Sequence, residues 1–173
     1  MDGYDRSLLV LGGARSGKSR FAQDAAENGP GDLIYIATAQ ALDGEMAERI
    51  AMHQGDRGPR WRTVEAPVDL AGAIAEHSCD GTVLLIDCLT LWASNLMFAQ
   101  QDVDAATQAL TAAIDAAPGR IILVSNEVGL GIVPDNALAR QFRDVAGRIN
   151  QAVARAAGKV VFVAAGLPLI LKG

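Results

Sequence analysis

One motif near the start of the chain constrains its fold more than any other feature. Residues 12–19 read Gly-Gly-Ala-Arg-Ser-Gly-Lys-Ser and follow directly on the apolar run 8–11. This is the Walker A pattern, G-x-x-x-x-G-K-[ST], in its expected place. Because the motif needs a strand that leads through a glycine-rich loop into a helix, it predicts an α/β domain that binds a nucleoside triphosphate.

The residue types of this loop indicate what it binds. Glycines let the backbone wrap closely round a ligand, successive N–H groups point at phosphate oxygens, and the following helix N-terminus adds partial positive charge. We expect Lys18 to supply a mobile cation and Ser19 to offer its hydroxyl to a bridging Mg²⁺. The predicted nucleotide-binding residues of the loop are Gly12, Gly13, Ala14, Arg15, Ser16, Gly17, Lys18 and Ser19.

Length and composition limit the class of protein. The 173 residues suit one core, so we expect a single nucleotide-binding domain over 1–173. A formal net charge of −5 argues against a nucleic-acid surface, because phosphate backbones require a clustered excess of cations. No apolar run approaches the roughly 18 residues of a membrane span, and the start is unlike a signal peptide. We therefore expect no membrane span and a cytoplasmic location.

Neither cysteine carries a signal for a site. Cys79 and Cys88 lack the spacing of metal ligands, and two cysteines are too few for a disulfide scaffold. Cys88 follows an apolar run in which buried thiols are common, so we interpret both as structural thiols.

Three arginines, Arg57, Arg60 and Arg62, lie close together around Trp61. Two interpretations stay open: a patch that binds an anionic ligand within an acidic protein, and a solvated basic loop. The adjoining Pro/Gly-rich stretch 55–59 is predicted to be a loop.

Apolar runs alternate with helical periodicity along the chain, which is typical of a mostly parallel sheet flanked by helices. The predicted strands are 7–11, 33–37, 82–87, 120–125 and 159–165. The clearest helix spans about 136–157, with Asp135 as N-cap and Gly158 as its stop. Its apolar stripe consists of Leu138, Phe142, Val145, Ile149 and Val153. With the Walker A motif, this pattern predicts a single-domain P-loop NTPase.

Two predicted strands end in carboxylates. Asp87 closes 82–87 as a Walker B residue would, and it is expected to hold the Mg²⁺ water shell; a turn or helix cap is the alternative. Glu127 follows the strand 120–125 at the sheet edge where α/β proteins bind ligands, and there it would orient a substrate hydroxyl. A loop carboxylate satisfied by local hydrogen bonds is the alternative for Glu127.

One histidine draws attention by its spacing. His53 shares a helical face with Met46 and Ile50, in a stretch with Asp43 as its possible N-cap. The spacing equally fits a histidine packed at a helix C-terminus, where the dipole favours its charged form. His77 is interpreted as a surface turn residue.

Several segments together carry a resemblance that covers nearly the whole chain. They are Gly12–Ser19, Tyr35-Ile-Ala-Thr-Ala39, Asp43-Gly-Glu-Met46 with Arg49-Ile50 and His53, Trp61-Arg-Thr-Val-Glu65, Asp87-Cys-Leu-Thr-Leu-Trp92, Ser125-Asn-Glu-Val-Gly-Leu-Gly-Ile-Val-Pro134 and Phe142-Arg-Asp-Val-Ala-Gly-Arg148. This set resembles the bifunctional adenosylcobinamide kinase / adenosylcobinamide-phosphate guanylyltransferase family. The string over 126–134 is its most specific part, since P-loops occur in very many proteins.

The resemblance implies two reactions of cobalamin assembly: phosphorylation of adenosylcobinamide by ATP or GTP, then transfer of GMP from GTP to that phosphate. The products of the second reaction are adenosylcobinamide-GDP and pyrophosphate. It also implies a RecA-like fold, a homotrimer, and a guanylylated histidine, for which His53 is the matching position. Beyond the P-loop, the implied nucleotide site contains Thr38, Ala39, Gln40, Gln54, Gly55, Asp56, Arg57, Glu65 and Asp87.

The chemistry of these residues fits the implied reactions. A neutral imidazole at His53 is a competent nucleophile, while Lys18, Mg²⁺ and the loop N–H groups stabilise the departing pyrophosphate. The base that activates the substrate hydroxyl stays open between Asp87 and Glu127. A corrinoid kinase without guanylyltransfer and a non-enzymatic GTP-binding switch are the alternative functions.

Overall fold

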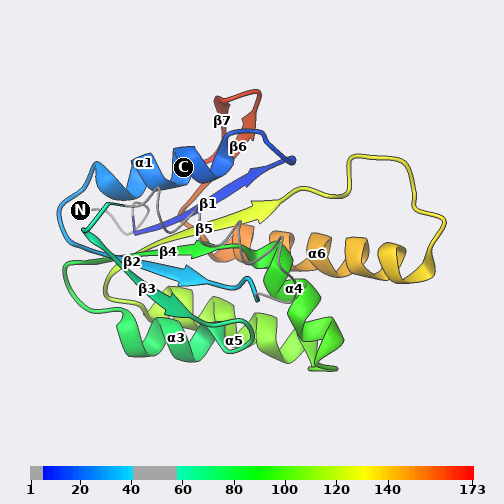
Figure 1. The fold of residues 1–173 in the computed structure, drawn as a ribbon, viewed down its shortest axis with the longest axis horizontal. Coiled ribbons are helices and arrows are strands. Elements are labelled where there is room, and N and C mark those ends of the chain that lie inside the picture. Colours follow the sequence, from blue (N-terminus) through cyan, green and yellow to red (C-terminus); the bar gives the residue numbers. More distant parts are fainter. Residues whose placement is uncertain (1–5, 41–57) are drawn as a thin grey trace.

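The computed structural model describes residues 6–40 and 58–173, and within them seven strands form one sheet (Figure 1). The strand order is β3-β2-β4-β5-β1-β6-β7. The strands are β1 Ser7–Gly12, β2 Asp32–Ala37, β3 Trp61–Glu65, β4 Thr82–Asp87, β5 Arg120–Asn126, β6 Lys159–Ala164 and β7 Leu167–Lys172. Neighbouring strands are parallel except β6 and β7, so the expected mostly parallel sheet is confirmed.

Helices cover both faces of the sheet (Figure 1). The described helices are α1 Lys18–Glu27, α3 Leu70–His77, α4 Leu89–Phe98, α5 Val103–Ala116 and α6 Ala137–Ala156. The helix α1 packs on one face, and α3 to α6 pack on the other. Among these described helices, none is long and apolar enough to cross a membrane.

Side-chain alternation along the strands divides the core in two. In β1, Leu8 and Val10 pack with Ala22 and Ala26 of α1, whereas Leu9 and Leu11 pack in the larger cluster beneath α3 to α6. Successive side chains of a strand point to opposite faces, and both faces here are covered, so β1 is apolar without interruption from Leu8 to Leu11. The apolar runs of the sequence are near-continuous because helices cover both faces of the sheet.

All five predicted strands are present, and two further strands were not predicted. β3 reads Trp-Arg-Thr-Val-Glu and lies at the edge of the sheet, where each of its residues is half-buried or exposed and polar residues are tolerated. β7 follows β6 through the two-residue turn Ala165–Gly166, in which φ is 51° and 79°. Alanine is an uncommon first residue for such a turn, so the hairpin signal was weak.

The helix α6 agrees with its prediction except at its cap. It begins at Ala137, and the side chain of Asn136 accepts a hydrogen bond from the N–H of Ala139 at 3.1 Å. The predicted N-cap, Asp135, was therefore one residue early. The stop is nearly as predicted, because Ala157 is the C-cap and Gly158 follows it.

The assignment of His77 to a surface turn was wrong. His77 is the last residue of α3, and its side chain is only 14% exposed. Similarly, Trp61 and Arg62 belong to the strand β3 rather than to a basic loop. Within the stretch 55–59, only Gly58 and Pro59 are described, and they precede the first residues of β3.

Candidate nucleotide-binding site

The Walker A residues form the predicted strand–loop–helix unit. β1 ends at Gly12, and α1 begins at Lys18. The N-cap of α1 is Gly17 with φ 94°, a left-handed conformation that suits glycine, and it has no side chain to cap the helix. The first-turn N–H groups of α1 are thereby left to a ligand, and the helix N-terminus favours an anion.

Two glycines of the loop, Gly12 and Gly17, are required by close packing, and Gly17 also by its backbone conformation. A Cβ atom on Gly12 would lie 2.5 Å from Ser16 Oγ and 2.6 Å from the carbonyl oxygen of Val163. At Gly17 a Cβ atom would lie 3.2 Å from the Cα of Gly166. Gly12 and Gly17 are consequently held between the ends of β1 and β6 with no room for a larger residue, whereas a Cβ atom on Gly13 would meet open space.

The turn between β6 and β7 contacts the loop directly, which the sequence analysis did not anticipate. The N–H of Gly166 donates a hydrogen bond of 2.8 Å to the carbonyl oxygen of Ser16. The only local signal for this contact was the Ala165–Gly166 pair. The β6–β7 hairpin therefore supports the P-loop from the side away from β5.

Lys18 is placed to act as the cation of the site. Its side chain is largely covered, with the residue 9% exposed, and Nζ donates a hydrogen bond of 3.1 Å to the carbonyl oxygen of Gly13. An ammonium group has three protons to donate, so this contact leaves donors for phosphate oxygens. The Lys18 side chain folds back, so its ammonium group lies against the P-loop backbone.

Thr38 joins the carboxyl ends of β2 and β4. Its N–H donates to the carbonyl oxygen of Asp87 at 3.2 Å, and its hydroxyl exchanges two hydrogen bonds of 2.8 Å with Cys88. The side chain of Asn95 in turn donates to the carbonyl oxygens of Thr38 and Pro67, both at 2.8 Å. The buried Thr38 hydroxyl thus orders the backbone that carries Asp87.

The remaining predicted site residues divide into two groups. Ala39 and Gln40 follow Thr38, and Glu65 ends β3, so all lie at the carboxyl edge of the sheet with Asp87. Glu65 is four strand positions from β1, or roughly 19 Å across the sheet, too far from the P-loop to reach the same phosphate. His53, Gln54, Gly55, Asp56 and Arg57 lie outside the described residues.

Glu127 makes a local hydrogen bond, as expected if it is a loop carboxylate satisfied by its neighbours rather than a substrate ligand. Its Oε1 accepts from the N–H of Gly129 at 2.7 Å, while its own N–H donates to the carbonyl oxygen of Gly12 at 3.0 Å. Arg143 of α6 donates to the carbonyl oxygen of Gly129 at 2.6 Å. One oxygen of the carboxylate is therefore engaged in ordering the loop after β5.

The residues of this edge fit a magnesium–triphosphate complex. In the described ranges, no three His, Cys, Asp or Glu side chains gather as a metal cage. Ser19 and Asp87 would leave most of the coordination sphere to phosphate oxygens and water, which is the usual way proteins bind Mg²⁺. Bound there, the ion would neutralise phosphate charge.

Comparison with known sequences assigns the chain to a family. The family described as cobinamide kinase / cobinamide phosphate guanyltransferase matches residues 8–171. The chain belongs to this family. The bifunctional adenosylcobalamin biosynthesis protein CobP of Pseudomonas aeruginosa is 50% identical over 167 residues, covering 95% of this chain and 96% of that protein. Protein CobU of Salmonella typhimurium is 42% identical over 180 residues, covering 95% and 99%.

Solved structures of other proteins share the fold of this chain. An ATPase of a bacterial type III secretion system matches with a TM-score of 0.56 and 12% identity, over 96% of this chain and 57% of that chain. The flagellar accessory protein FlaH of Methanocaldococcus jannaschii matches with a TM-score of 0.51 and 15% identity, over 97% and 78%. The expected RecA-like P-loop fold is confirmed, as is the resemblance to the family.

Proposed function

We propose that this chain catalyses both reactions for which its family is named. The first is the phosphorylation of adenosylcobinamide by ATP or GTP, and the second is the transfer of GMP from GTP to the resulting phosphate. The observation that carries the proposal is the family match over 8–171 together with a complete P-loop. A cytoplasmic location is part of the proposal.

In the kinase reaction, an alcohol oxygen of the corrinoid attacks the γ-phosphorus, and the bond from that phosphorus to the β-bridging oxygen breaks. The nucleoside diphosphate leaves, and the alcohol proton passes to a base. Lys18 and the N–H groups of the loop stabilise the charge that grows on the leaving oxygen. Ser19 and Asp87 would hold the Mg²⁺ ion that binds with the phosphates.

In the transfer reaction, we propose that an imidazole nitrogen of His53 attacks the α-phosphorus of GTP and that pyrophosphate leaves. A phosphate oxygen of the corrinoid then attacks the guanylyl phosphorus, and the P–N bond breaks to regenerate the histidine. The same loop groups stabilise pyrophosphate, so one site serves both reactions. The His53 role rests on the family resemblance.

Labelled GTP tests the covalent step. The protein is incubated with α-labelled or γ-labelled GTP and Mg²⁺, denatured, and then treated with acid, beside His53→Ala and the matched control His77→Ala. We expect acid-labile α-label in the native protein and in His77→Ala, and none in His53→Ala. No label in the native protein, with GTP still bound and cobinamide still phosphorylated, would support a kinase without guanylyltransfer. GTP binding without any turnover would support a switch module.

The single-site proposal is tested at Lys18. Because both reactions use the same phosphate-binding loop, Lys18→Ala is expected to lower both rates by at least roughly a hundredfold. The measurement is the initial rate of cobinamide phosphorylation and of pyrophosphate release. A variant that loses only one activity would show that the reactions use different sites.

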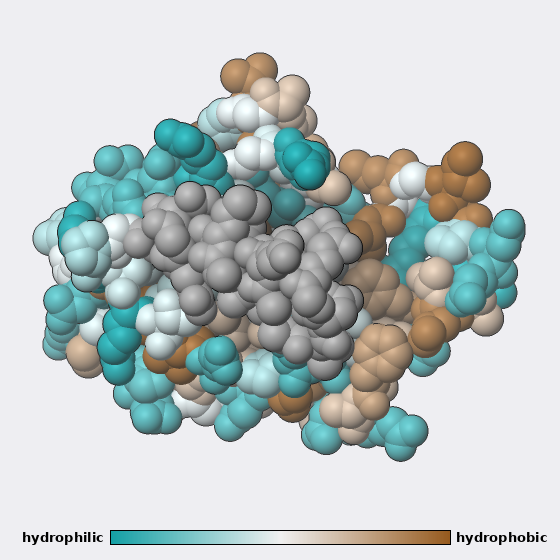
Figure 2. Space-filling view, in the orientation of Figure 1, coloured by the Kyte–Doolittle hydropathy of each residue, from teal (hydrophilic) through white to brown (hydrophobic). Residues whose placement is uncertain are grey.

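Exposed apolar surfaces support the expected homotrimer. Figure 2 shows hydrophobic residues gathered over the segment between β5 and α6 and over the β6–β7 hairpin. The exposed apolar side chains of these two regions are Leu130, Ile132, Val133, Leu167, Leu169, Ile170 and Leu171. Ile132 is 96% exposed, and an apolar surface of this kind is typical of a subunit contact.

Light scattering after size-exclusion chromatography measures the assembly. We expect three times the chain mass of 18.1 kDa, and a smaller species for Ile132→Glu. A native protein that elutes as a monomer at all concentrations would contradict the trimer.

A further inference from the structure

The strand that lies next to the P-loop strand ends in a residue that the proposed mechanism does not use. β5 pairs with β1 on one side and with β4 on the other. In the β1–β5 register Asn126 is opposite Gly12, and in the β4–β5 register Asp87 is opposite Val124. Asn126 is therefore level with the start of the P-loop, between that loop and the strand of Asp87.

Alternation along β5 determines which face of the sheet each side chain occupies. Ile122 and Val124 belong to the cluster packed against α1, whereas Ile121 and Leu123 belong to the cluster beneath α3 to α6. Asn126 continues the first series, so its side chain falls on the face of α1 and the P-loop. Glu127 follows the last residue of β5, and its side chain is engaged by the N–H of Gly129 in the loop that begins there.

The backbone of Asn126 is held by a buried network on the opposite face. Its N–H donates to Thr90 Oγ1 at 2.7 Å, and its carbonyl oxygen accepts from Asn150 Nδ2 at 3.3 Å. Ser125 Oγ donates to Asn150 Oδ1 at 2.6 Å. Thr90, Ser125 and Asn150 are all buried, so helices α4 and α6 fix the end of β5.

One polar atom of the Asn126 side chain lacks a hydrogen-bond partner. Its Oδ1 is buried and has no hydrogen-bond partner among the described residues. The only other such atom in that part of the chain is Ser16 Oγ, within the P-loop itself. A buried acceptor without a donor destabilises the protein, and native structures keep few of them unless a ligand or water completes the bond.

We propose that Asn126 binds substrate in the nucleotide site, its side-chain carbonyl oxygen accepting a hydrogen bond from an O–H group beside the phosphates. Two sources supply that chemistry: a water molecule on the Mg²⁺ ion of the bound triphosphate, and the alcohol of the corrinoid acceptor. The inference rests on the proposed nucleotide site and is independent of the guanylyl-histidine.

Two matched alanine variants separate binding from structural support. In Asn126→Ala, we expect the melting temperature of the nucleotide-free protein to stay equal or to rise, because an unpaired buried oxygen is removed. In Asn150→Ala, we expect it to fall, because Ser125 Oγ and the carbonyl oxygen of Asn126 both lose a partner. A purely structural role for Asn126 would lower the melting temperature in both.

Calorimetric binding of a non-hydrolysable GTP analogue, with and without Mg²⁺, then identifies the donor. A loss of roughly tenfold in affinity for Asn126→Ala only when Mg²⁺ is present would assign the metal-bound water. Unchanged nucleotide affinity, with a KM for adenosylcobinamide raised roughly tenfold in the kinase assay, would assign the alcohol. Asn126→Asp keeps an oxygen acceptor in place, so in either case it is expected to recover most of the loss.

The proposal is overturned if Asn126→Ala changes neither the nucleotide affinity nor the KM for the corrinoid, or if the affinity falls equally with and without Mg²⁺ while that KM is unchanged. It is also overturned if the nucleotide-free Asn126→Ala protein melts as far below the native protein as Asn150→Ala does. Failure of the native protein to bind the analogue would instead overturn the nucleotide site on which the inference rests.

Discussion

The two cysteines occupy opposite environments. Cys79 is exposed, whereas Cys88 is buried at the carboxyl end of β4, beside the hydroxyl of Thr38. Burial, and secondarily the negative charge of Asp87, raises the pKa of the Cys88 thiol to about 11. The thiolate is the reactive form of cysteine, so the identity of the residue alone does not decide its reactivity.

Alkylation of the native protein is expected to modify Cys79 alone. At pH 8, a pKa of about 11 leaves about one Cys88 thiol in a thousand ionised, and burial excludes the reagent as well. Mass spectrometry after brief treatment with iodoacetamide should find one adduct, and two after denaturation. A native adduct on Cys88 would show that the end of β4 opens readily.

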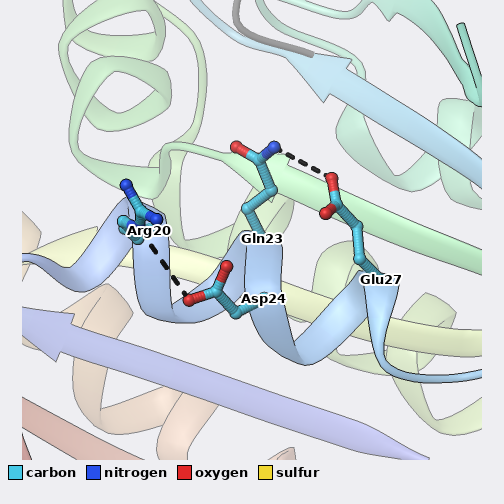
Figure 3. Close-up of polar contacts among 4 residues, drawn as sticks. All are labelled: Arg20, Gln23, Asp24 and Glu27. Atoms are coloured by element: carbon cyan, nitrogen blue, oxygen red, sulfur yellow. Dashed lines mark hydrogen bonds and ion pairs between the residues drawn. The ribbon is translucent and has the colours of Figure 1, made fainter. Parts of the chain in front are cut away.

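At the scale of elements, a carboxylate joins α1 to the edge strand β3. Glu27 Oε1 accepts hydrogen bonds from Trp61 Nε1 at 2.8 Å and from Gln23 Nε2 at 2.9 Å. Figure 3 shows the contact with Gln23, together with the exposed ion pair of Arg20 and Asp24. The hydrogen bond from Trp61, followed by that from Gln23, lowers the pKa of Glu27, because both donors favour the charged form.

This lowered pKa predicts a pH-dependent contribution to stability. The contribution is present above the ordinary pKa of the carboxyl group and is lost as the pH falls through the lower pKa of the folded state. Because solvent reaches the Glu27 carboxylate and screens it, Glu27→Gln should reduce the free energy of unfolding by no more than about 0.5 kcal/mol near neutral pH and by nothing measurable near pH 2. Urea denaturation across this range measures the difference, and a difference independent of pH would contradict the assignment.

The start of α6 offers a second test at this scale. Asn136→Ala removes the side-chain oxygen that accepts from Ala139, so we expect the free energy of unfolding to fall by about 1 kcal/mol. The adjacent Asp135→Ala is the matched control and should change it by less than about 0.5 kcal/mol. If urea denaturation showed equal losses of stability for the two variants, Asn136 would not be the specific N-cap of α6.

At the scale of the whole molecule, parallel strand order concentrates the site at one edge. The P-loop after β1, Asn126 at the end of β5 and Asp87 at the end of β4 lie at one edge because these three strands are neighbours. Two buried polar atoms there, Ser16 Oγ and Asn126 Oδ1, have no hydrogen-bond partner among the described residues, and a bound ligand would supply one. Nucleotide binding at this edge should therefore raise the free energy of unfolding of the whole domain.

We expect Mg²⁺–GTP at about a hundred times its dissociation constant to stabilise the protein by about 2.7 kcal/mol. For a chain of 173 residues, this corresponds to a rise of roughly 5–10 °C in melting temperature. Differential scanning fluorimetry measures the shift. Lys18→Ala should lose most of it, and an equal shift in that variant would mean that GTP binds elsewhere.

Local rules were enough for a large part of this protein. The P-loop, the buried strands and the length of α6 follow from motif spacing, apolar runs and helical periodicity, which act over a few neighbouring residues. The family, too, was evident from short strings such as 126–134. Even so, the same rules placed the N-cap at Asp135 instead of Asn136, because both residues are good caps and only the backbone path selects one.

Tertiary structure decided which residues meet. The sequence predicted β1, β4 and β5 as strands, yet their order depends on pairings between residues more than thirty positions apart, which no local pattern encodes. That order puts Asn126 level with Gly12, and it makes β3 an edge strand that needs no apolar run. Sequence therefore determined the chemistry this chain carries, while long-range strand pairing determined which side chains share the site.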